Sequence, residues 1–328
     1  MTACDLAVVG GGPAGTAAAI TAARLGARVV LFAAPGEASR IPESLHPAGL
    51  SLLEELGLED IESVCAGPAY ARVWHWDGNP GSFGGEWRGR HVRRDLLDAA
   101  LLRRAAEAGV VTVEARARWQ GADESGCRIA AGARAFDAGL VIDGSGAAQF
   151  LRRALNLERR KFSGPLVSAR GMARGRSPHG DEPSFHRDED GWTWIAPLGG
   201  GRAAWTRTSL KREAPRLPDG LQSEGESEAF GRAWQAVDAV AGAFHLLAGD
   251  AAGHLDPAGG DGVVLALESG RNAALAAMCA RAGPAGRQAE LQTYGRWWQA
   301  RFAAKAKALA QIYAGAGLGR LLVRDAAG

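Results

Sequence analysis

This chain of 328 residues has few cysteines and little net charge, and these two properties exclude several classes of protein. The four cysteines stand far apart and form no C-x-x-C pair, which argues against a zinc site and against a disulfide framework. We expect buried thiols in a reducing cytoplasm. The 38 basic and 36 acidic side chains leave a net charge of +2, too small for a surface that follows nucleic-acid phosphates.

A secretion signal and a membrane span are not expected either. Residues 6–23 carry no charge, but Gly10–Pro13 lies in their middle and Asp5 stands where a signal peptide needs positive charge. We therefore predict a folded turn here, a cytoplasmic location and no integral membrane association. Hydrophobic residues at 47% and charged residues at 23% are typical of a folded protein with one large or two interlocked domains.

A strand, a glycine-rich turn and a helix open the chain. Apolar runs at 5–9 and 28–32 flank an Ala-rich stretch, which predicts a βαβ unit. The turn between them fits G-x-G-x-x-G, a spacing that permits a tight turn, close approach of a pyrophosphate, and packing of helix on strand. We predict that this turn binds the ADP half of a dinucleotide, with a turn that holds no ligand as the alternative. Its residues are Gly10, Gly12, Pro13, Ala14 and Gly15.

An acidic side chain is missing from the end of the second strand. In dinucleotide sites a carboxylate at this point binds the ribose hydroxyls. The position falls at Ala33, and its neighbours Phe32 and Ala34 carry no charge. Glu37 follows on a loop and could take over the contact. Without such a replacement, we expect the cofactor to be held loosely.

The remaining pattern predicts an α/β protein with two interleaved domains. Helices are expected over 48–56, 94–108, 263–282 and 294–312, and apolar strands over 110–113 and 139–142. We assign residues 1–66, 89–158 and 242–282 to a Rossmann-type cofactor domain. The β-sheet substrate domain then comprises residues 67–88 and 159–241, and residues 283–328 form a C-terminal helical segment.

Three further segments resemble the flavoprotein monooxygenase superfamily, which includes para-hydroxybenzoate hydroxylase, geranylgeranyl reductases and flavin-dependent halogenases. Residues 249–262 (GDAAGHLDPAGGDG) resemble its G-D-A-A…P…G-x-G signature. Residues 143–146 (DGSG) resemble its D-G-x-G segment, and residues 92–101 (VRRDLLDAAL) resemble its V-x-R-x-x-L-D-x-x-L element. The resemblance spans nearly the whole chain and implies the para-hydroxybenzoate hydroxylase fold with FAD as cofactor.

The resemblance also implies roles for individual residues. Asp250 would bind a ribityl hydroxyl and Arg94 would lie beside FAD. The glycines after Pro257 would present backbone N–H groups to the flavin ring, where a helix N-terminus stabilises the negative charge of reduced flavin. Besides the glycine-rich turn, the implied cofactor-binding residues are Ser44, Arg94, Asp250, Pro257, Gly260, Gly262 and Val263.

Two more segments indicate the branch of the superfamily. Residues 42–45 (PESL) resemble a loop of halogenases, and residues 192–197 (WTWIAP) resemble their W-x-W-x-I-P, with Ala196 in place of Ile. The two tryptophans either pack in the core or shield the flavin. Halogenases take an active-site lysine from the region between this loop and the Arg element, and residues 47–90 contain no Lys. The resemblance is therefore nearer to the branch that hydroxylates a tryptophan in a partner protein.

This resemblance predicts an FAD-dependent monooxygenase that hydroxylates an electron-rich aromatic through a flavin C4a-hydroperoxide. Candidate proton donors or substrate contacts are Glu43, His46 and Asp261, although His46 could equally serve as a hydrogen-bonding loop residue. No second G-x-G-x-x-G is found, so electrons would come from transiently bound NADH or NADPH or from a separate flavin reductase.

The substrate and two rival functions stay open at this point. The substrate domain is lean, so the substrate is either an aromatic small molecule or a peptide or protein that supplies part of the wall around the reaction. Trp74, Trp76 and Trp87 would then be contact residues or would line a closed pocket. The rivals are a flavin-dependent reductase of prenyl or polyketide double bonds and a non-catalytic flavoprotein-fold partner.

Overall fold

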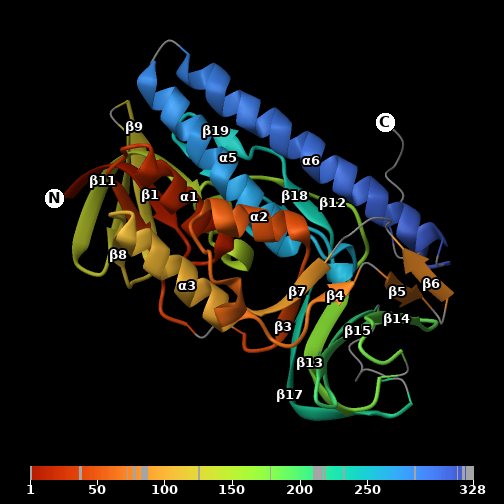
Figure 1. Ribbon diagram of the computed structural model, residues 1–328. Coiled ribbons are helices and arrows are strands. Elements are labelled where there is room, and N and C mark those ends of the chain that lie inside the picture. The colour runs from red at the N-terminus through yellow and green to blue at the C-terminus, as the bar shows by residue number, and fades with distance from the viewer. Residues whose placement is uncertain are drawn as a thin grey trace.

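A mostly parallel sheet carries the glycine-rich turn (Figure 1). The structure is a computed structural model that describes residues 2–36, 39–71, 73–76, 79–82, 88–124, 126–177, 179–209, 217, 219–231, 233–283, 286–315, 317–319 and 322. In this sheet the strands run in the order β19-β20-β11-β1-β2-β8, and β9 and β10 extend it from β11. The strands are β1 (Thr2–Val9), β2 (Val29–Phe32), β8 (Val111–Val113), β9 (Ala117–Asp123), β10 (Gly126–Ala131), β11 (Arg134–Asp143), β19 (Ala241–Gly242) and β20 (His245–Leu247).

Parallel pairing sets the position of the site. Strands β20, β11, β1, β2 and β8 all run in the same direction, so their carboxyl ends meet at one edge, where open α/β sheets bind ligands. The four residues of β2 are all buried, as expected for a strand covered on both faces.

A second, antiparallel-rich sheet of seven strands stands beside the first. Its order is β17-β13-β16-β15-β14-β5-β6, and β5 joins β14 in parallel although it comes from a much earlier part of the chain. The strands are β5 (Val73–Trp76), β6 (Asn79–Ser82), β13 (Val167–Gly175), β14 (Ser184–Arg187), β15 (Gly191–Gly199), β16 (Arg202–Ser209) and β17 (Leu221–Gly231). Two small sheets complete the set, β3 (Pro42–Leu45) with β7 (Arg88–Arg93) and β4 (Tyr70–Ala71), and β12 (Arg159–Lys161) with β18 (Gln235–Val237) and β21 (Gly253–His254).

Helices α1, α5 and α6 form the layer that links the two large sheets. Helix α5 packs against both α1 and α6, and Figure 1 shows α6 running along α5. At its far end α6 reaches the seven-stranded sheet, where Nε1 of Trp192 donates a hydrogen bond to Oη of Tyr313 at 2.7 Å. The helices are α1 (Pro13–Arg24), α2 (Pro47–Glu55), α3 (Arg94–Glu107), α4 (Phe150–Ala154), α5 (Gly262–Ala282) and α6 (Arg287–Gly315), with 3₁₀ turns η1 (Ile61–Val64), η2 (Gly146–Ala148), η3 (Gly249–Ala251) and η4 (Pro257–Gly259).

Helix α5 is long and apolar enough to cross a membrane by length and composition, and it is the one described helix of which this is true. In the fold, 61% of its most apolar window is buried inside the protein. It packs against α1, α2 and α6. Its apolar character is therefore accounted for by its place in the core.

The predicted α/β class and the βαβ unit at the N-terminus are confirmed, and two expectations need correction. The last helix begins at Arg287 rather than near Tyr294, because its first turns are mostly exposed and polar and so lack the apolar period used to find it. The cysteines are not all buried, since Cys279 is exposed and Cys65 is half-buried. The domain boundaries stay a prediction.

The contact between α1 and α5 yields a prediction about stability. A Cβ atom at Gly270 would lie 2.0 Å from the carbonyl oxygen of Ala14, so Gly270→Ala forces the two helices apart. We expect a loss of about 1–3 kcal/mol in the free energy of unfolding, measured by urea denaturation. Gly283→Ala is the control, because a Cβ there meets no described atom within 4 Å. Equal stability of the two variants would contradict this account of the packing.

Candidate active site

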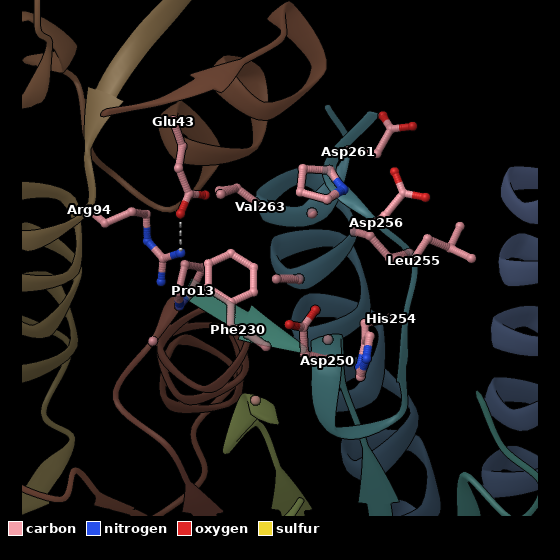
Figure 2. A pocket seen from close by; sticks show the side chains of 18 of the residues that line it. Pro13, Glu43, Arg94, Phe230, Asp250, His254, Leu255, Asp256, Asp261 and Val263 are labelled. Carbon is pink, nitrogen blue, oxygen red and sulfur yellow. Dashed lines mark hydrogen bonds and ion pairs between the residues drawn. The ribbon is translucent and has the colours of Figure 1, made fainter. Parts of the chain in front are cut away.

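A cavity of about 1440 Å³ lies over the carboxyl edge of the parallel sheet. Ligand pockets commonly enclose about 300–1,000 Å³, so this space can hold a dinucleotide and leave room for a second molecule. The glycine-rich turn lines one part of it, and strands β14, β15 and β17 with helix α6 line another. Figure 2 shows the part between Arg94 and Asp261.

The glycine-rich turn places bare backbone against the cavity. Gly10 has φ +113°, and a Cβ there would lie 2.3 Å from the carbonyl oxygen of Gly144, so only glycine fits. At Gly12 a Cβ would meet nothing nearer than a guanidinium nitrogen of Arg94 at 3.9 Å, because that side of the backbone faces the cavity. Gly15 does not line the cavity; a Cβ there would lie 1.8 Å from the carbonyl oxygen of Gly10, so its role is helix-to-strand packing.

Two helix N-termini open into the same cavity. Helix α1 begins at Pro13 and α5 begins at Gly262, and neither has a side-chain cap or an acidic residue in its first turn. Their first N–H groups lack intrahelical partners and carry partial positive charge. An elongated ligand with negative charge at two points, such as FAD with its pyrophosphate and its reduced ring, fits this arrangement.

Arg94 and Glu43 belong to an ion-pair network in the cavity wall. Nη1 of Arg94 lies 3.4 Å from Oε1 of Glu43, and the same oxygen lies 2.5 Å from Nη1 of Arg170. Burial acts against the charge of Arg94, but Glu43 and Asp98 outweigh it and raise the pKa of Arg94. Figure 2 shows Glu43 pointing toward Arg94. Because Glu43 contacts two guanidinium groups, its surroundings favour a positioning role over proton donation.

Ser44 holds one tryptophan of the WTWIAP segment in the cavity wall. Its Oγ accepts a hydrogen bond from Nε1 of Trp194 at 3.2 Å and lies 3.0 Å from Nδ1 of His91. Burial lowers the pKa of His91 to about 4, so its ring is neutral. Its Nδ1 can therefore accept a hydrogen bond from the Ser44 hydroxyl group. Both tryptophans of the segment line the cavity; Trp192 is fully buried and Trp194 is half-buried. Whether either one shields a flavin stays a prediction.

His46, Asp261 and Lys305 form a cluster on the cavity wall. Nε2 of His46 lies 2.9 Å from Oδ1 of Asp261, and Nζ of Lys305 lies 2.6 Å from Oδ2. The three residues come from three places in the chain: the start of α2, the start of α5 and the middle of α6. Lys305 was not among the predicted residues, because it lies outside residues 47–90, the region in which the halogenase resemblance places an active-site lysine. Its helical spacing with Ala308, Leu309 and Ile312, which also line the cavity, was the available signal.

A buried carboxylate fixes the loop before α5. One oxygen of Asp256 accepts hydrogen bonds from Nε1 of Trp234 and from Oη of Tyr313, the latter at 2.8 Å, and the other accepts from the backbone N–H of Ala258 at 2.9 Å. Burial raises the pKa of Asp256 above its ordinary value, against the effect of these donors. This network ties the turn that precedes Gly260 to α6, and the sequence did not predict it.

The structure brings nearly all the predicted site residues together. Asp250 lines the cavity with His254, on the far side of Phe230 from Arg94 (Figure 2). The side chains of Trp74, Trp76 and Trp87, and Glu37, lie outside the described residues. The predicted residues that line the cavity are Gly10, Gly12, Pro13, Ala14, Glu43, Ser44, His46, Arg94, Asp250, Pro257, Gly260, Asp261, Gly262 and Val263. Their individual roles stay predictions.

Comparison with known proteins agrees with this geometry. Residues 5–174 match the family model described as "Lycopene cyclase protein". The chain is 28% identical over 335 residues to a digeranylgeranylglycerophospholipid reductase from Methanoculleus marisnigri. The aligned region covers 90% of this chain and 82% of the relative.

Solved structures share the fold. A flavin-dependent brominase superimposes with a TM-score of 0.77 at 21% identity, over 91% of this chain and 84% of its own. A halogenase variant solved in complex with FAD superimposes with a TM-score of 0.67 at 16% identity, over 84% of this chain and 70% of its own. This is an FAD-binding fold.

The open space at Gly12 predicts a variant that folds but binds FAD poorly. Gly12→Val places its methyl groups in the cavity, where a pyrophosphate would approach the backbone. We expect the FAD dissociation constant to rise at least about tenfold, or about 1.4 kcal/mol, measured by quenching of flavin fluorescence. The thermal midpoint, as control, should stay close to that of the parent. A folded variant with unchanged FAD affinity would show that the turn does not hold the cofactor.

Proposed function

The chain belongs to the lycopene cyclase protein family, and from that premise we propose that it is an FAD-dependent monooxygenase that hydroxylates an electron-rich aromatic group. The family match covers residues 5–174, and the reaction is argued from the site. Bound FAD supplies the electrons and the activation of O₂. The electrons for FAD come from NADH, NADPH or a separate flavin reductase, and we place the protein in the cytoplasm.

The residues present fit FAD. Gly12 and the start of α1 would hold the pyrophosphate, and Asp250 would accept a hydrogen bond from a ribityl hydroxyl. The start of α5, at Gly262 and Val263, would present its N–H groups to the ring. Arg94 lines the same cavity near Gly12, and its guanidinium group is held by Glu43 and Asp98.

The observation that carries the proposal is an aromatic wall on the substrate side of the cavity. Phe185, Trp194 and Phe230 line it, and the ring centroids of Phe185 and Trp194 lie 4.5 Å apart. Leu309 and Ile312 of α6 add aliphatic surface. Such a wall packs against a planar ring and excludes water from the reaction. A tryptophan of a peptide or protein and a free aromatic molecule both present the ring that this wall accepts.

The His46 cluster lies beside this wall and handles the proton that oxygen transfer requires. His46 holds the proton and delivers it to the leaving oxygen. Asp261 fixes the imidazole ring through Nε2, in the way that a carboxylate orients a catalytic histidine. Lys305 balances the charge of Asp261 from the other side.

A second candidate function is reduction of prenyl double bonds. The relative that is 28% identical over 90% of this chain is a digeranylgeranylglycerophospholipid reductase, and the aliphatic surface from α6 suits an apolar chain. A reductase would form its product without O₂. A non-catalytic partner protein would do neither reaction.

An isotope experiment separates these functions. The FAD-loaded protein is supplied with NADH or NADPH, with and without an added flavin reductase, under ¹⁸O₂ and with tryptophan, indole-containing peptides or phenols as substrates. Mass spectrometry should find one ¹⁸O atom in the aromatic product. Saturation of a geranylgeranyl lipid in the absence of O₂, with no labelled aromatic, would establish the reductase instead. Absence of both reactions in the FAD-loaded protein would contradict the proposal.

The proton-transfer role generates its own prediction. His46→Gln keeps a polar side chain but removes the imidazole ring, which can give and take up a proton. Product formation should fall at least about 100-fold while O₂ consumption continues and H₂O₂ appears. FAD affinity should not change, and Lys307→Met, on the exposed part of α6, should behave as the parent. Full activity in His46→Gln would remove His46 from the mechanism.

A further inference from the structure

Among the described residues that line the far end of the cavity, beyond strand β2, there is no carboxylate of the kind that dinucleotide sites place there. Ala34 lines the cavity and is exposed, whereas Ala33 does not line it. The carboxylates of described residues that line the cavity are Glu43, Asp250, Asp256 and Asp261. None of them stands on the described segments directly after β2 and β8, and Glu114, which follows β8, does not line the cavity. The described residues that line this end of the cavity therefore offer the ribose hydroxyls no carboxylate acceptor.

Strand pairing brings an arginine to this position instead. Strand β8 runs parallel to β2 with Phe32 opposite Val113, and the N–H of Ala33 donates to the carbonyl oxygen of Val113 at 3.0 Å. The residues that follow the two strands therefore leave the sheet side by side. Ala34 on one segment and Arg116 on the other line the same cavity.

A second arginine faces the cavity from the other side of β1. Helix α4 follows β11, which pairs with β1 on the edge opposite to β2. Phe150, Arg153 and Ala154 form one face of α4 and line the cavity. Within the described part of the chain, neither Arg116 nor Arg153 has a carboxylate partner.

We propose that Arg116 and Arg153, which line the cavity from the two sides of β1, form a clamp on the AMP half of bound FAD. A guanidinium group stacks on an aromatic ring such as adenine and donates charge-assisted hydrogen bonds to phosphate. The binding of the AMP half then depends on positive charge rather than on an acceptor for ribose hydroxyls. The clamp rests on the FAD binding in the proposed function, but not on the reaction.

Calorimetric titration of the apo protein with ADP, FAD and FMN tests the clamp. FMN carries the flavin and one phosphate but no adenosine. ADP carries the AMP moiety that the clamp contacts and no flavin. Arg116→Ala and Arg153→Ala should each weaken ADP and FAD binding about tenfold and leave FMN binding unchanged. Arg118→Ala is the matched control: Arg118 is exposed, its Nη2 donates to the carbonyl oxygen of Gly132 at 2.9 Å, and it does not line the cavity.

The possible results separate the clamp from the proposed function. FAD and ADP affinities equal to the parent's in both arginine variants would overturn the clamp, and so would an equal loss of FMN binding. A parent protein that binds ADP but not FAD would overturn the FAD-dependent function, while loss of ADP binding in Arg116→Ala would still support the contact of this arginine with an AMP moiety. A parent that binds neither ligand would overturn both. Thermal midpoints of the variants confirm that they are folded.

Discussion

The close packing of α1 on α5 is the constraint on which the site depends. Gly270 lets α5 lie against the backbone of Ala14 in the first turn of α1, and the backbone N–H of Gly249 is held by Oγ of Ser269 on α5 at 2.8 Å. With the two helices fixed in this way, both N-termini point into one cavity. Each alone would be an ordinary helix end, but together they make a site for a ligand with two separated negative charges.

The part of the cavity that is lined by the seven-stranded sheet depends on the long C-terminal helix, α6. Helix α6 supplies Lys305 to the cluster around Asp261, and Tyr313 to the buried carboxylate of Asp256. The same Tyr313 accepts a hydrogen bond from Trp192 of the seven-stranded sheet. One helix thus connects the loop before α5, the seven-stranded sheet and the cluster of His46, Asp261 and Lys305. The substrate side therefore depends on an element that is distant in sequence from both cofactor motifs.

The sequence predicted what local spacing determines and missed what distant pairing determines. The turn at Gly10 could be found because glycine spacing between a strand and a helix reflects backbone geometry within a few residues, and residues 249–262 were found by their resemblance to a flavoprotein signature. Lys305 and Arg116 were missed, because they reach the cavity through the packing of α6 and the pairing of β8 with β2. The hydrogen bonds of buried Asp256 could not be predicted either, since nothing near it in sequence indicates that Trp234 and Tyr313 contact it.

The central claim is that one FAD lies across the two helix ends of this cavity, and a visible-absorbance titration of the purified protein with FAD tests it most directly. The account predicts saturation at one flavin per chain, with the flavin bands shifted and better resolved than in water because the ring enters a partly apolar site. The spectrum of free flavin at every ratio, from a protein that circular dichroism shows to be folded, would contradict it.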